Sequence, residues 1–194
     1  MSVVFTTQEA LCQYSTEQTV LTSIPSSVAI EKKASNTEGS IRPETGAING
    51  TLSSEYELSI NDNTENYSFA VYSTMNTTSG EVSAFAQRNQ LMFGNLSNPP
   101  LAEDVEKARN NEQGNADVIV YPFTLSYSNQ ENIKEEYIPV QSYGNLYKIT
   151  FLNGLLTGTL TQTVTGDPIA NTYSTEDTPG TYAATVYITV IQNE

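Results

Sequence analysis

The chain has 194 residues and a formal net charge of −14, from 22 acidic residues against 8 basic ones. Proteins bind nucleic acids and anionic membranes through Lys and Arg contacts, so we expect such an acidic chain to bind neither. No apolar run approaches the roughly 18 residues of a membrane span. The sequence contains no His and a single Cys, which excludes His-based triads, His-ligated zinc, thiolate clusters and an intrachain disulfide.

The first third of the chain has short β-type segments separated by turn residues. An apolar segment at 3–5 is followed by Cys12, which we interpret as a buried, inert thiol. Strands are predicted at 19–24, 27–30, 55–60 and 67–72, and the polar stretch 31–47 reads as a long loop. The last two of these strands flank the turn-forming residues 61–66, so we expect them to form a hairpin.

One helix is predicted, at residues 101–110, after the pair Pro99-Pro100. Acidic residues fall in its first turn and basic residues in its last, which complements the helix dipole. Its apolar stripe is thin and consists of Leu101, Val105 and Ala108. We therefore expect a short surface helix.

The second half of the chain returns to β-type patterns, with strands predicted at 117–127, 136–140, 146–151, 155–164 and 181–192. Pro122 lies inside the first of these strands and indicates a sheet edge or a bulge. A pattern of about nine strands with almost no helix predicts an all-β, antiparallel β-sandwich, with a jelly roll as the alternative. We expect residues 1–194 to form one such domain.

The final segment has the clearest pattern in the chain. Period-two alternation over 181–192 predicts a continuous strand with one buried face. That face carries Tyr182, Ala184, Val186, Ile188 and Val190.

With His-based and Cys-based sites excluded, the remaining candidate for catalysis is a pair of carboxylates, as in glycoside hydrolysis. The acidic residues near predicted strand ends are Asp117, Glu135, Glu136 and Asp167. Surface solvation is the expected role of such residues in so acidic a chain, and the Trp residues typical of carbohydrate clefts are absent from the sequence. We therefore expect no enzyme, no catalytic residue, no metal and no cofactor.

Both ends of the chain resemble fimbrial (pilus) subunits that are assembled through a chaperone and an usher. The start, a short apolar strand around Val3 and Phe5 followed by Cys12, is similar to their opening, and residues 178–190 are similar to their C-terminal strand. The resemblance implies an immunoglobulin-like sandwich that lacks one strand. Residues 1–12 would then be a donor or edge strand, with Val3 and Phe5 filling the groove of a neighbouring subunit.

The same resemblance implies the partners and the location. The face from Tyr182 to Val190 would border the acceptor groove, and a periplasmic chaperone would cover it before neighbouring copies, of the same or a related subunit, are added. The mature chain, without its signal peptide, would lie at the cell surface. Two other functions stay open: a monomeric adhesin or carbohydrate-binding β-sandwich module, and a virion structural protein.

Overall fold

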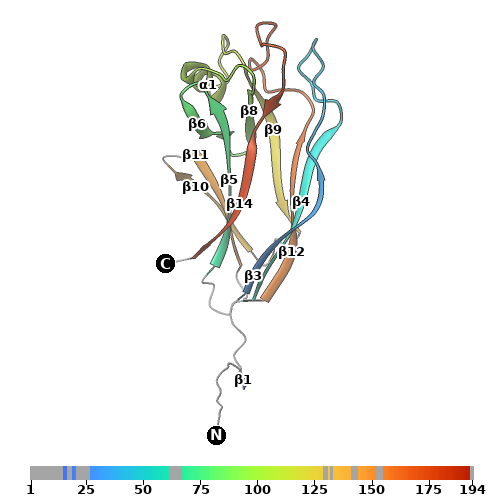
Figure 1. The fold of residues 1–194 in the computed structure, drawn as a ribbon, viewed down its shortest axis with the longest axis vertical. Coiled ribbons are helices and arrows are strands. Elements are labelled where there is room, and N and C mark those ends of the chain that lie inside the picture. The colour runs from blue at the N-terminus through green and yellow to red at the C-terminus, as the bar shows by residue number, and fades with distance from the viewer. Residues whose placement is uncertain are drawn as a thin grey trace.

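The computed structural model describes residues 15–16, 19–20, 27–61, 67–128, 131, 133–140, 144–151 and 155–192 (Figure 1). Within these residues the chain folds into two antiparallel sheets that face each other, with one short helix at one end. No helix in this part of the chain is long and apolar enough to cross a membrane. The expected all-β, antiparallel β-sandwich is confirmed.

The first sheet has five strands in the order β10-β11-β5-β14, and β6 also pairs with β5. Its strands are β5 (Tyr67–Thr77), β6 (Gly80–Ser83), β10 (Ile133–Val140), β11 (Gly144–Phe151) and β14 (Thr185–Gln192). The sheet is assembled from segments far apart in the sequence, because the C-terminal strand pairs with β5 from the first half of the chain.

The second sheet has seven strands in the order β13-β8-β9-β12-β4-β3, and β7 also pairs with β8. Its strands are β3 (Ser27–Asn36), β4 (Thr51–Asn61), β7 (Phe85–Gln87), β8 (Gln90–Asn95), β9 (Val118–Tyr127), β12 (Leu155–Thr165) and β13 (Tyr182–Ala183). A separate pair, β1 (Ser15–Thr16) and β2 (Thr19–Val20), precedes both sheets.

Two expectations for the first third of the chain are wrong. The polar stretch after residue 30 is not all loop, because β3 continues to Asn36 along β4, with a bulge after Lys32. Lys33 at this bulge forms ion pairs with Glu31 and Glu57, both at 3.2 Å, so charges on an exposed edge support a strand that looks like a loop in the sequence.

The predicted hairpin between β4 and β5 does not form either. β4 pairs with β3 and β12, whereas β5 pairs with β6, β11 and β14, so the two strands lie in opposite sheets. Both strands bury apolar residues on their inner face. Such amphipathic strands satisfy the same pattern whether they pair side by side or face each other across a core.

The helix α1 (Ala102–Arg109) forms where expected but is less superficial than its sequence indicates. Val105 and Ala108 are buried in the core, whereas Leu101 is the N-cap and is 49% exposed. An Arg109 guanidinium N–H donates to the carbonyl of Phe85 at 3.2 Å and ties the helix to β7. The strands β6, β7 and β8 under this end of the sandwich were not predicted.

Pro122 is accommodated where two ladders meet. The pairing of β8 with β9 ends at Pro122, and the pairing of β12 with β9 begins at Phe123. The missing amide hydrogen of Pro122 therefore interrupts neither ladder. The expected sheet edge or bulge is wrong, because β9 lies inside the second sheet between β8 and β12 and neither of its pairings shows a register shift.

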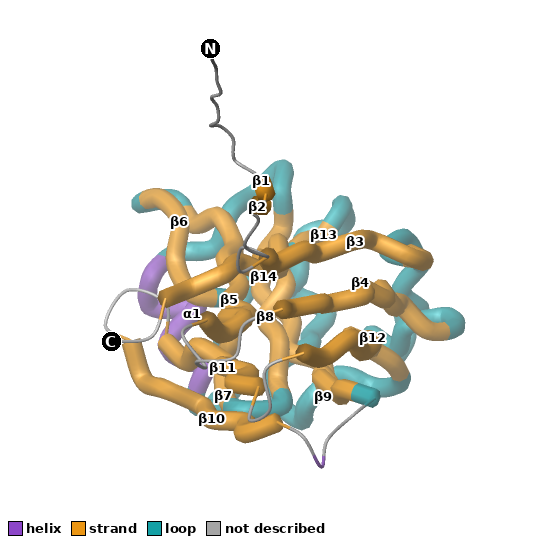
Figure 2. The backbone as a smooth tube through the Cα atoms, turned by 90° about the horizontal axis from the view of Figure 1, so that it is seen from below, coloured by secondary structure: helices purple, strands orange, loops and turns teal. Residues whose placement is uncertain are grey.

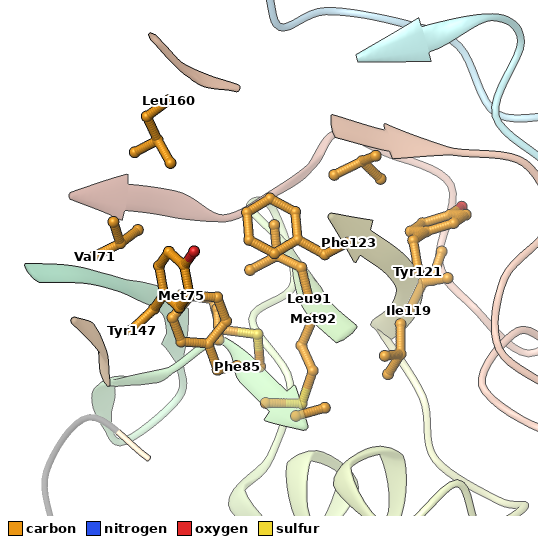
Figure 3. Close-up of a cluster of buried hydrophobic side chains, with 14 of the residues drawn as sticks. Val71, Met75, Phe85, Leu91, Met92, Ile119, Tyr121, Phe123, Tyr147 and Leu160 are labelled. Carbon is orange, nitrogen blue, oxygen red and sulfur yellow. The ribbon is translucent and has the colours of Figure 1, made fainter. Parts of the chain in front are cut away.

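The core between the sheets is aromatic-rich, and Figure 3 shows part of it. Tyr121, Tyr147, Phe69 and Phe85 are among its largest fully buried side chains. Tyr127 lies against Gly158 so closely that a Cβ at Gly158 would approach the ring to 2.4 Å. Burial raises the pKa of Tyr127 to about 12, because the phenolate would be poorly solvated there.

Candidate functional site

The C-terminal strand β14 forms one edge of the first sheet, because its described pairing is with β5 alone. Val186, Ile188 and Val190 pair with Ser73, Val71 and Phe69, which point into the core. The predicted division of the strand into two faces therefore holds for the direction of these side chains, but the predicted burial does not, because Val186 and Ile188 are only half-buried and Val190 is exposed. On the opposite face, Tyr187 stacks on Tyr72 with ring centroids 4.9 Å apart.

The edges β14 and β3 lie on the same side of the sandwich, one from each sheet (Figure 2). Both edges leave inward-facing apolar residues incompletely covered: Ile30 of β3 is 36% exposed and Val190 of β14 is 37% exposed. Ile188 of β14 is half-buried as well. We call this open side between β3 and β14 the seam.

Two cavities lie beside the seam, where they border residues 181–186 and the segment that follows β3, although Ile30, Ile188 and Val190 line neither of them. One, of about 90 Å³, is lined mainly by apolar side chains of β4, β8, β9, β12 and β14. The other, of about 410 Å³, lies towards the 37–41 segment and the β13 strand. They share Thr37, Leu52, Phe93 and Ala184, so together they form one groove with an apolar wall.

The three long edge strands differ in how they are protected against pairing with another chain. β3 has the charges of residues 31–33 and a bulge, and β10 has Lys134, Glu135, Glu136 and Pro139. Charges, bulges and prolines are the features that keep sheet edges from pairing. β14 reads Thr-Val-Tyr-Ile-Thr-Val-Ile-Gln and has none of them.

The predicted continuous strand 181–192 is in fact divided between the sheets. Tyr182 and Ala183 pair with β8 of the second sheet, and the chain then crosses at Ala184 to join β5 of the first. The crossing places Tyr182 and Ala184 beside the larger cavity and Val186 beside the smaller one. The alternation in sequence is unbroken, so it gives no sign of this change of partner.

A hydrogen-bonded cluster around Asp117 fixes the start of that crossing. Asp117 is 6% exposed and lies in the left-handed region with φ 64°. Its carboxylate accepts hydrogen bonds from the Thr178 backbone N–H at 2.8 Å, the Thr178 hydroxyl at 3.2 Å, the Tyr182 hydroxyl at 3.3 Å and the Asn98 amide. We call this group of four side chains the Asp117 latch.

Asp177 supports the latch from the other side. Its carboxylate accepts the backbone N–H of Asp117 at 2.8 Å and that of Ser174 at 2.7 Å. Burial raises the pKa of Asp177, and these two hydrogen bonds oppose the rise. The hydrogen bonds of this pair of carboxylates join the loop segments around residues 98, 117 and 174–178 to each other and to β13, which is the arrangement of a structural support.

The remaining sequence candidates do not converge. Asp167 is exposed in the loop after β12, while Glu135 and Glu136 lie on β10 at the opposite edge of the first sheet from β14. The described residues include no group of three or more His, Cys, Asp or Glu side chains that could hold a metal. Val3, Phe5 and Cys12 lie outside the described residues, so the donor-strand role of the first two stays a prediction.

Comparison with known proteins adds little to this geometry. No protein-family model matches the chain, and no curated protein matches it. Among solved structures, the chain is similar to a family 3a carbohydrate-binding module from the CipA scaffolding of Clostridium thermocellum. The sequence identity is 10% and the TM-score is 0.28, and the match covers 86% of this chain and 100% of that one. A likeness this remote carries no argument about the site.

Proposed function

We propose that this chain is a structural subunit of a bacterial surface fibre, a pilus or fimbria, and that neighbouring copies join by adding a strand along β14. In this proposal the seam is the acceptor, and the apolar segment around Val3 and Phe5 of the next copy is the donor. A location at the cell surface and a periplasmic chaperone that covers the seam before assembly belong to the same proposal.

The observation that carries the proposal is the contrast between β14 and the other long edges. β14 is unprotected over eight residues, and the apolar residues behind it are partly open to solvent. An added strand would satisfy the free backbone groups of β14 and cover Val190 and Ile30 at the same time. Main-chain hydrogen bonds would provide affinity, and the apolar groove would select the side chains.

The proposal predicts that deleting residues 2–7 blocks association but leaves folding intact. The intact chain should form concentration-dependent oligomers in sedimentation velocity, and the deletion variant should stay monomeric with an unchanged circular dichroism spectrum. A full-length variant carrying Val3→Asp and Phe5→Asp serves as a control for chain length and should behave like the deletion. A chain that is monomeric with and without residues 2–7 would sink the proposal.

A monomeric carbohydrate-binding or adhesin module is the second candidate, and the aromatic pair on the outer face of the first sheet favours it. Tyr187 is 39% exposed and stacks on Tyr72, which gives a flat aromatic surface of the kind that sugar rings contact. This candidate expects a monomer that binds a glycan array and loses the binding in Tyr187→Ala. Glycan binding that is lost in Tyr187→Ala would distinguish this module from a fibre subunit, which would assemble along the edge of β14.

A further inference from the structure

The inner face of β12 contains a buried polar side chain, whose cross-strand partner on β4 is the buried Ser54. Gln162 lies between Leu160 and Val164, which are both buried, and is itself only 7% exposed. Its Nε2 has no hydrogen-bond partner among the residues that the structure describes, although the side chain lines the smaller cavity. A buried amide donor without an acceptor is costly, so its retention needs an explanation.

A second unsatisfied polar group lies in the opposite sheet, next to Val186 in the strand pairing. Ser73 of β5 is fully buried, and its hydroxyl has no hydrogen-bond partner within the described part of the chain. It pairs with Val186, which lines the cavity together with Gln162. Each of the two opposed sheets therefore has one buried, unsatisfied polar atom close to Val186, beside a cavity whose lining is mainly apolar but includes Thr37, Ser53 and Ser54. That position suits a hydroxyl group, which can accept one hydrogen bond and donate another.

We propose that Gln162 determines the register and specificity of the seam, by selecting an added strand that places a hydroxyl side chain opposite Val186, and that Thr7 of a second copy is that residue. The inference rests on the proposed strand addition and specifies it further. Gln162 acts by binding the incoming segment and has no part in any reaction.

The spacing of the N-terminal segment agrees with this register. Val3, Phe5 and Thr7 share one face of an extended segment. In an antiparallel pairing with Thr7 opposite Val186, Phe5 falls opposite Ile188 and Val3 falls opposite Val190. The two apolar donor residues would thus cover Val190, which is 37% exposed, and Ile188, which is half-buried, while the hydroxyl would lie on the same side as the Gln162 amide.

The test measures binding of a fluorescein-labelled peptide of residues 2–9 to the full chain carrying Phe5→Asp, which disables the chain's own donor segment. Fluorescence anisotropy should show that Thr7→Val in the peptide weakens binding about tenfold, because it leaves the Gln162 amide without an acceptor in a closed groove. The matched peptide with Thr6→Val should bind like the unmodified one, because residue 6 faces outward.

A substitution of Gln162 tests the same assignment from the protein side, because it should reverse the preference for Thr7 over valine in the peptide. In Gln162→Met, which keeps the volume and removes the amide, the Thr7→Val peptide should bind at least as tightly as the unmodified peptide. If no peptide binds, strand addition by this segment is wrong, and the proposed function fails with it. If the peptides bind but Thr7→Val and Thr6→Val are equivalent, strand addition stands and the role of Gln162 is refuted, whatever the stability of Gln162→Met.

Discussion

Replacing Asp117 with alanine is expected to lower the free energy of unfolding by about 3 kcal/mol, because a buried acceptor of several hydrogen bonds disappears and leaves its donors unsatisfied. The donors include the backbone N–H and the hydroxyl of Thr178. Alanine also tolerates the left-handed conformation at this position less well than aspartate does. Urea unfolding monitored by circular dichroism measures the change.

Asp117→Asn is the matched control. Asparagine keeps the shape, the tolerance of positive φ and one acceptor oxygen, so the loss should be about half as large. An Asp117→Ala variant within about 0.5 kcal/mol of the unmodified chain would show that the latch is dispensable. In that case the crossing at Ala184 must be held by the strand pairing of β13 and β14 alone.

The second large effect is expected from a lysine in the seam. Val190→Lys places a charge on the inner face of β14, where an added strand would have to bury it, so association should weaken about 100-fold. Because Val190 is 37% exposed, the free subunit should lose little stability. Sedimentation velocity across a concentration series measures the association, and thermal unfolding measures the stability.

Thr185→Lys is the control for this effect, because Thr185 is exposed and lies on the outer face of the same strand. Its association constant should change much less than that of Val190→Lys. Equal losses in both variants would indicate that added positive charge, and not obstruction of the seam, is responsible. Such a result would contradict the placement of the acceptor on the inner face.

The inward and outward faces of single strands could be predicted from the sequence, because period-two alternation reports burial directly. This holds for Tyr56, Leu58 and Ile60 on β4 as well as for the inner face of β14. Pairing partners could not be predicted, because alternation is the same whichever strand lies alongside. The failed hairpin of β4 with β5 and the crossing at Ala184 are both errors of this kind.

The seam was predicted in part. The alternating end of the chain indicated a strand with one apolar face, but its position at an edge depends on long-range pairing with β5. Asp177 and Gln162 gave no signal in the sequence, since a carboxylate and an amide in polar surroundings are ordinary surface residues. Asp177 matters because its partner Asp117 is 60 residues away in the sequence, and only the folded chain brings the two together.

The central claim, that β14 accepts a strand from another copy, is tested most directly by hydrogen exchange of its backbone amides. The exchange is compared between the assembled chain and the monomeric Val190→Lys variant, residue by residue over 185–192. We predict that assembly slows exchange at alternate residues, those whose N–H groups do not bond to β5, while β10 at the opposite edge is unchanged. Assembly that leaves the exchange of β14 unaltered would contradict the claim.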